Sequence, residues 1–212
     1  TELKTRLRLY LVTDAFLCTT PDLVTTVRLA VANGVTMVQL REKTATSAER
    51  VQMALAIKEA LAGTGVPLVV NDDVTAAVAA DVDGAHIGQG DMSTAKARAL
   101  LGPDKILGLS CETAQAVQAA DPALVDYLGL GPVFGTATKA DHAQPIGLDG
   151  LAQLVALSPL PNVAIGGLKS IHVSDVRESG ADGMAVVSAI CGQTDPAASA
   201  RAFGALKTEE IF

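Results

Sequence analysis

The chain contains few residues of the kinds that form disulfide frameworks, zinc sites or histidine-based catalytic sets. Its 212 residues include only three cysteines, three histidines and no tryptophan. Cys18, Cys111 and Cys191 are widely spaced and lie outside any CxxC pattern, which favours free thiols in a reducing compartment such as the cytoplasm. Because the histidines are equally scattered, neither a zinc triad nor a Ser-His-Asp or Cys-His arrangement is indicated.

Long hydrophobic runs and an excess of positive charge are also missing. No segment approaches the roughly 20 apolar residues that span a bilayer, and no signal-peptide pattern follows the basic residues near the start. We therefore expect a soluble protein with no membrane partner. The formal net charge of -7 argues against a general nucleic-acid binder but not against a small anionic substrate. The sequence leaves the oligomeric state open, a homo-oligomer included.

Short apolar segments alternate with alanine-rich amphipathic segments along the whole chain. The predicted strands are residues 7–13, 36–40, 68–71, 84–88, 106–110, 127–133, 163–166 and 183–187. The predicted helices are residues 21–33, 47–62, 74–80, 93–101, 114–120, 148–157, 172–179 and 196–206. Strict alternation predicts parallel βα units, and eight units of about 26 residues suffice for a closed barrel. We predict an α/β fold, a single-domain (β/α)8 TIM barrel over residues 1–212.

Polar residues follow the second predicted strand, where a barrel gathers its functional side chains. Strand alternation points Gln39, Arg41 and Lys43 to one side, and two cations with an amide suit a phosphate-rich ligand. The alternative is a salt-bridge cluster of Arg41, Glu42 and Lys43 on the barrel rim.

Acidic residues follow the third and fourth strands. Asp72 and Asp91 can share a hard cation whose other ligands are water and phosphate oxygens, the arrangement that magnesium prefers. The alternative is helix capping, and Asp73 is a better cap than ligand because it directly precedes a predicted helix. His86 lies within an apolar strand and is predicted to be a hydrogen-bonded core or rim residue.

Hydroxyls, glycines and a lysine follow the last three strands. The long loop after the sixth strand carries Thr136, Thr138 and Lys139, which can supply hydrogen bonds and a charge to one anion, although the loop also reads as an ordinary polar one. Residues 165–167 and 187–188 follow strands seven and eight, where such barrels commonly hold a phosphate. The alternative for the paired glycines is a tight bend.

Taken in order, these segments resemble the thiamine-phosphate synthase family. The resemblance runs from about residue 9 to residue 190 and is carried by residues 39–43, 71–73, 84–89, 108–110, 129–139, 164–167 and 186–190. It implies a (β/α)8 enzyme that joins hydroxymethylpyrimidine diphosphate to thiazole phosphate, giving thiamine phosphate and pyrophosphate.

The resemblance also implies roles for individual residues. The pyrimidine diphosphate would be held by Gln39, Arg41, Lys43, Asn71, Ser110 and Lys139, magnesium (Mg2+) by Asp72 and Asp91, and the thiazole phosphate by Thr136, Thr138, Gly167, Val187 and Ser188. Of these, Arg41, Lys43, Ser110 and Lys139 would be catalytic. The chain departs from the family pattern at Gly90, Gly135 and Glu112, where the family often has glutamate, proline and a nearby histidine.

Two other functions stay open at this point. A thiazole tautomerase of the same superfamily would keep the phosphate pocket at Gly167 and Ser188 but needs no site for a diphosphate and its metal. A non-catalytic sensor of a phosphorylated ligand would bind without releasing pyrophosphate. The fold alone excludes neither.

Overall fold

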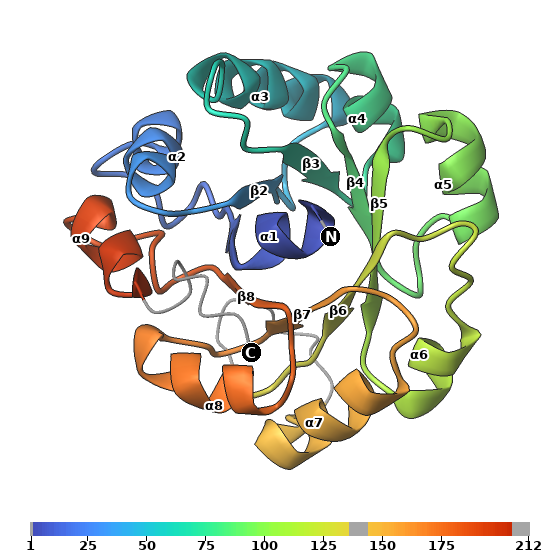
Figure 1. The fold of residues 1–212 in the computed structure, drawn as a ribbon. Helices are drawn as coiled ribbons and strands as arrows, with labels where there is room; N and C mark the ends of the chain where they lie inside the picture. The colour runs from blue at the N-terminus through green and yellow to red at the C-terminus, as the bar shows by residue number, and fades with distance from the viewer. Residues whose placement is uncertain (1, 136–143, 205–212) are drawn as a thin grey trace.

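The computed structural model describes residues 2–135 and 144–204 and contains a closed barrel of eight parallel strands. The strands follow one another around the ring in chain order, and each pairs with its two neighbours (Figure 1). They are β1 (Leu9–Val12), β2 (Met37–Leu40), β3 (Leu68–Asn71), β4 (Gly84–Ile87), β5 (Ile106–Cys111), β6 (Tyr127–Leu130), β7 (Asn162–Ile165) and β8 (Gly183–Val186). The predicted (β/α)8 architecture is confirmed.

Helices form a ring outside the strands (Figure 1). They are α2 (Leu23–Ala32), α3 (Ser47–Ala60), α4 (Val74–Ala79), α5 (Thr94–Leu101), α6 (Ala114–Ala119), α7 (Gly147–Leu157), α8 (Val173–Glu178), preceded by the 3-10 turn η1 (Ser170–His172), and α9 (Pro196–Arg201). Each corresponds to a predicted helix, with ends that differ by a few residues.

One further helix, α1 (Glu2–Leu7), was not predicted, because residues 2–7 were expected to lead directly into the first strand. In Figure 1 this helix lies across the centre of the ring. Leu7 is fully buried, and Leu3 packs against the interior cluster that contains Tyr10 and Met37. Since β1 begins at Leu9, α1 lies at the amino-terminal end of the strands and leaves the opposite end for a ligand.

The strands bury both of their faces. One face packs on the helices in a large cluster, and the other fills the barrel with a smaller cluster around Tyr10, Val69, Tyr127 and Val163. This explains why the strands read as continuous apolar runs. At Gly84 a Cβ would lie 1.9 Å from the carbonyl oxygen of Ile106, so the close approach of β4 and β5 requires glycine there.

The three cysteines are free, as predicted, and all three are buried. Cys18 and Cys191 nevertheless meet in space, and a hydrogen bond between the two thiols lowers the pKa of Cys18 to about 7. No helix in the described part of the chain is long and apolar enough to cross a membrane.

Candidate active site at the carboxyl ends of the strands

Arg41 is held at the carboxyl end of β2 by the end of β1. Its backbone N–H donates to Thr13 Oγ1 at 3.1 Å, and its guanidinium Nη1 lies 3.5 Å from Asp14 Oδ2. Both side chains of this ion pair are largely buried, so the guanidinium has a defined position. Sequence reasoning missed Asp14, because an acidic residue two positions after a strand is not distinctive by itself. Arg41 therefore pairs with an acidic residue outside the alternative salt-bridge cluster of Arg41, Glu42 and Lys43.

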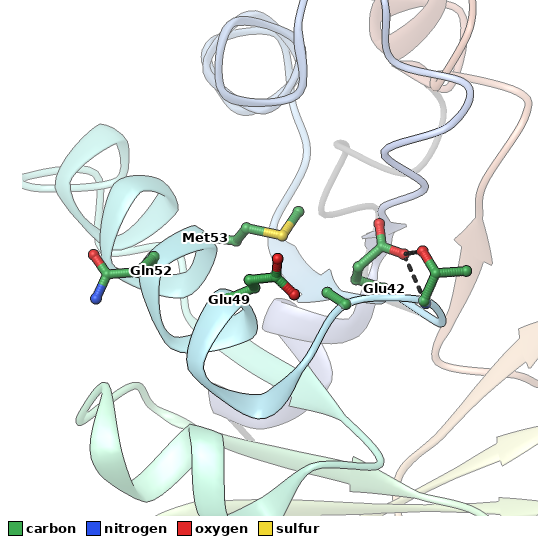
Figure 2. A pocket seen from close by; sticks show the side chains of 6 residues that line it. Glu42, Glu49, Gln52 and Met53 are labelled. Carbon is green, nitrogen blue, oxygen red and sulfur yellow. Dashed lines mark hydrogen bonds between the residues drawn. The ribbon is translucent and has the colours of Figure 1, made fainter.

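Lys43 is exposed and lies close enough to Asp72 for its charge to lower the pKa of that carboxyl group. Beside it, the loop after β2 and helix α3 enclose an open hollow of about 490 Å³ lined by Glu42, Glu49 and Met53 among others (Figure 2). Glu42 accepts hydrogen bonds from Thr44, and Glu49 closes the capping box at the start of α3. Carboxylates line this hollow, so it does not suit an anionic ligand.

The predicted pair of acidic residues converges. Asp72 follows β3, Asp91 lies in the loop after β4, and their carboxyl groups lie close enough to interact. The backbone N–H of Asp72 donates to the carbonyl oxygen of His86 at 2.8 Å, which extends the β3 and β4 pairing by one residue. Asp91 Oδ2 accepts the backbone N–H of Gly88 at 2.7 Å. These bonds position the main chain at Asp72 and the carboxyl group of Asp91.

Capping does not explain this pair. Asp73 is the residue that caps α4, since its Oδ1 accepts the N–H of Ala76 at 2.9 Å while Oδ2 pairs with Arg50 at 3.1 Å. Helix α5 is capped by Ser93, whose side chain accepts a hydrogen bond from the backbone N–H of Lys96. The prediction that Asp73 is a cap is confirmed, and Asp91 is free of that role.

The pKa of Asp72 is raised to about 6. Partial desolvation of its carboxyl group is the largest cause, and the neighbouring Asp91 carboxyl is the next, while Lys43 acts in the opposite direction. A divalent cation would relieve the repulsion between two such groups. Among residues 2–135 and 144–204 there is no cluster of three or more His, Cys, Asp or Glu side chains suited to a metal. A cation at Asp72 and Asp91 would thus take its other ligands from water or substrate oxygens, as magnesium commonly does.

A chain of hydrogen bonds crosses the barrel interior and ends at two predicted site residues. Gln39 Nε2 donates to the Tyr10 hydroxyl at 2.7 Å, and the hydroxyls of Tyr10 and Tyr127 are 2.8 Å apart. The Tyr127 hydroxyl lies 2.8 Å from His86 Nδ1, and His86 Nε2 lies 2.9 Å from Ser110 Oγ. These five residues come from β2, β1, β6, β4 and β5. The prediction that His86 is hydrogen-bonded in the core is confirmed.

Sequence reasoning missed the roles of Tyr10 and Tyr127. They are the only tyrosines in the chain, and both lie inside predicted strands. A hydroxyl in a buried strand needs a partner, and that need was the available signal. The loop after β4 also contacts Ser110, because Gln89 Nε2 donates to the backbone oxygen of Ser110 at 2.8 Å.

The paired glycines lie at the end of β7, which is four strands around the ring from β3 and three from β4. Gly166 and Gly167 both have positive φ, 105° and 64°, a conformation that L side chains rarely adopt. The backbone N–H of Phe134 donates to the carbonyl oxygen of Gly166 at 3.0 Å, and a Cβ at residue 167 would lie 2.7 Å from the carbonyl oxygen of Gly135. Phe134 and Gly135 therefore pack directly on these glycines, and the glycine pair forms a tight bend.

Other predicted residues lie on the same end of the barrel or outside the described residues. Asn71 is the last residue of β3, and Val187 and Ser188 directly follow β8. Thr136, Thr138 and Lys139 fall outside the described residues. At Gly90 and Gly135 a Cβ would meet open space, so the two departures from the family pattern there reflect no steric need for glycine.

Comparisons with known proteins agree with this arrangement. The family model described as Thiamine monophosphate synthase matches residues 9–190. Thiamine-phosphate synthase of Psychrobacter sp. (strain PRwf-1) is 52% identical over 193 residues, which cover 90% of each chain. Thiamine-phosphate synthase of Xanthobacter autotrophicus is 52% identical over 199 residues, 94% of each.

Solved structures give the same result for the fold. The thiamine phosphate pyrophosphorylase from Pyrococcus furiosus superposes with a TM-score of 0.87 at 32% identity, covering 96% of both chains. A 3-hexulose-6-phosphate synthase, at 17% identity and a TM-score of 0.68, shares the barrel alone.

Proposed function

The chain belongs to the thiamine monophosphate synthase family, and from this membership we propose that it joins hydroxymethylpyrimidine diphosphate to thiazole phosphate. The products are thiamine phosphate and pyrophosphate, so the enzyme is a transferase of the pyrimidinylmethyl group in thiamine biosynthesis. The observation that carries the proposal is the meeting of Asp72 and Asp91 at the carboxyl ends of β3 and β4. A reaction that expels pyrophosphate needs such a position for a divalent cation.

Two substrate sites fit on opposite sides of the barrel mouth. The acidic pair, with Arg41 and Lys43 nearby, suits the diphosphate and its cation. The bend at Gly166 and Gly167 is four strands from β3 and three from β4 around an eight-stranded ring, and its backbone amides suit the single phosphate of the thiazole. This separation lets the reacting ends of the two substrates meet over the barrel centre.

Residues that hold the pyrimidine diphosphate are assigned by motif. We assign Gln39, Arg41, Lys43, Asn71, Ser110 and Lys139 to this substrate and Thr136, Thr138, Gly167, Val187 and Ser188 to the thiazole phosphate. Within the first group Arg41 is best supported, because Asp14 and Thr13 orient it beside the strand ends. Lys43 is more exposed and its flexible side chain can follow a departing group.

Magnesium would be held by Asp72 and Asp91, and when bound it neutralises charge on the pyrophosphate leaving group. Arg41, Lys43 and Lys139 stabilise the same developing charge through hydrogen bonds and ion pairs. As the bond to pyrophosphate breaks, the electron-rich aminopyrimidine ring tolerates positive charge on its methylene carbon. The thiazole nitrogen then captures that carbon.

This scheme requires positioning and exclusion of water and needs no protein nucleophile. It accounts for a site whose assigned residues are cations, carboxylates, hydroxyls and amides and include no histidine, while His86 is buried in the barrel interior. Three free cysteines favour a reducing compartment, and we place the reaction in the cytoplasm. A homo-oligomer stays compatible with the proposal, which involves no nucleic acid.

The test mixes purified full-length protein with both substrates and magnesium chloride, then follows pyrophosphate and thiamine phosphate together. We expect both products in equal amounts, each requiring both substrates and lost on adding a chelator. Turnover of a thiazole substrate alone would instead favour a tautomerase. Tight binding with no pyrophosphate would favour a sensor, and either result would contradict the synthase.

A further inference from the structure

The hydrogen-bond chain from Gln39 to Ser110 has a direction. A tyrosine hydroxyl carries one proton, so it can donate only one hydrogen bond. Tyr10 accepts from the amide Nε2 of Gln39, and its proton therefore points to the next hydroxyl in the chain, that of Tyr127. The Tyr127 proton in turn points to Nδ1 of His86.

The direction determines the tautomer of His86. Because Nδ1 accepts from Tyr127, the ring proton of the neutral imidazole lies on Nε2. Nε2 then donates to Ser110 Oγ. The hydroxyl proton of Ser110 is not used inside the barrel and is available to donate toward the mouth, where Ser110 is partly exposed.

The opposite direction would require every member to change together. The Gln39 amide would have to rotate and present its oxygen to Tyr10, and Ser110 would have to donate to His86. Neither tyrosine can interrupt the hydrogen-bond chain by losing its proton, because burial raises the pKa of both Tyr10 and Tyr127 well above the usual value. The orientation of the Gln39 amide and the hydrogen-bonding role of Ser110 are therefore coupled across the barrel.

The barrel interior leaves space for this chain of hydrogen bonds. A Cβ at residue 108 would lie 2.2 Å from Cζ of Tyr127 and 2.4 Å from Nδ1 of His86, so only glycine allows those two groups to meet. The ring of Tyr127 also packs on the ring of His86 and, edge to face, on that of Tyr10. All three rings are thus held by packing as well as by hydrogen bonds.

We propose that Tyr10, Tyr127 and His86 are positioning residues that present Ser110 as a hydrogen-bond donor to the pyrimidine substrate. The inference rests on the proposed function for the identity of that substrate, which carries ring nitrogens and diphosphate oxygens as acceptors. The three residues touch no reacting atom and act through Ser110. With the chain broken, the Ser110 hydroxyl can turn inward to His86 and is lost to the substrate.

The first measurement is the tautomer of His86, read from the 15N chemical shifts of its ring nitrogens in uniformly labelled full-length protein. A His86→Gln sample identifies its signals. We expect Nε2 protonated and Nδ1 unprotonated in the parent protein, and a mixture of tautomers in Tyr127→Phe. Protonation at Nδ1 in the parent would overturn the proposal, as would an unchanged tautomer in the variant. This readout needs no activity, so it decides the matter even if the synthase assignment fails.

The second measurement is a double-mutant cycle on steady-state kinetics. Tyr127→Phe and Ser110→Ala should each raise KM for the pyrimidine diphosphate about fivefold to tenfold, the effect of one lost hydrogen bond, with KM for thiazole phosphate unchanged. Since one acts through the other, the double variant should be no worse than Ser110→Ala alone. Multiplying effects would show that the tyrosine acts only on the structure.

A matched control and a second variant guard against misfolding. Thr26→Val removes another buried hydroxyl, which donates to the carbonyl oxygen of Pro21, and should change neither the tautomer nor KM. If Tyr127→Phe does not fold, Tyr10→Phe breaks the chain one step earlier and should also leave the His86 tautomer mixed. A single retained tautomer in Tyr10→Phe would contradict the coupling to Gln39.

Discussion

The carboxyl group of Asp72 lies beside that of Asp91, although the two residues follow different strands. Two carboxyl groups this close repel each other when both are ionised, and they can share a hydrogen bond only when one of them is protonated. Their backbones are held at the strand ends, through His86 for one and Gly88 for the other, so the two residues stay neighbours on the barrel rim. The mutual repulsion of the ionised groups is thus a fixed property of the site.

Asp72→Asn should lower turnover at least about 100-fold, since it removes one of two charged ligands for the cation, while the fold is retained. Asparagine suits this position because, like aspartate, it tolerates the positive φ of 62°. The measurement is the rate of pyrophosphate release at saturating magnesium, beside a thermal unfolding curve. Unchanged magnesium-dependent turnover in this variant would refute the assigned role.

Asp73→Ala is the matched control at the next position. It removes the cap of α4 and the ion pair with Arg50, so it should reduce the free energy of unfolding by about 1 kcal/mol. Turnover at a temperature where the variant is folded should stay within about twofold, because Asp73 faces the helix and not the mouth. A loss of turnover as large as that of Asp72→Asn would mean that both aspartates bind the cation.

The raised pKa of Asp72 predicts how stability depends on pH when no metal is bound. The folded pKa is about 6 and the usual value is 3.8, so between these values the folded protein binds more protons than the unfolded chain. The destabilising contribution of this group is therefore absent below about pH 4 and grows as pH rises to about 6, above which it is complete. Denaturant unfolding in chelator should give a smaller drop in stability over this range for Asp72→Asn than for the parent. Identical curves would show that the carboxyl group is not perturbed.

The fold was predictable because the same sequence pattern recurs at each strand. Each strand is short, apolar and followed by an amphipathic segment, so an error at one strand, such as the end of β6 at Leu130 in place of residue 133, leaves the architecture unchanged. The helix α1 was missed because its apolar face consists of only Leu3 and Leu7, and Leu7 was predicted to begin the first strand. It is stabilised by Leu3 and Leu7 packing into the barrel end, a contact that exists only after the barrel has closed.

The placement of the candidate site residues was predictable where they lie within a few residues of the end of a strand. Asp72, Asp91 and Arg41 belong to that class, because parallel strands bring their carboxyl ends to one rim. The Tyr10 to Tyr127 contact could not be predicted, since it depends on which residues face each other across the barrel. That relationship depends on the stagger of the strands and on the space left by Gly108.

Gly167→Ala should weaken both the protein and its binding of the thiazole phosphate. A Cβ there would lie 2.7 Å from the carbonyl oxygen of Gly135 and 2.8 Å from Cβ of Phe134, in addition to the strain at positive φ. Gly63→Ala is the control, because residue 63 also has positive φ, 77°, but a Cβ there meets nothing within 4 Å. We expect a loss of about 1 kcal/mol for Gly63→Ala and at least about twice that for Gly167→Ala. Only the latter should raise KM for thiazole phosphate; equal effects on stability and KM would exclude a special role for the bend.

The same substitution at opposite ends of the barrel separates function from stability. Arg41 lies at the carboxyl ends of the strands, paired with Asp14. Arg98 lies at the other end, where its guanidinium donates to the carbonyl oxygens of Leu124, Gly102 and Lys105 and to the Asp126 carboxylate, at 2.6 to 2.9 Å.

Lysine keeps the charge at either position but loses the planar fork of donors. Arg41→Lys should therefore raise KM for the pyrimidine diphosphate about tenfold and change stability by less than about 1 kcal/mol, because lysine keeps the positive charge beside Asp14. Arg98→Lys should leave several acceptors unpaired and cost about 2 kcal/mol or more, with KM unchanged. Steady-state kinetics and urea unfolding of the two variants decide the point. The assignment fails for Arg41 if its lysine variant loses stability and keeps its KM, since the carboxyl end of the barrel would then be structural at this position.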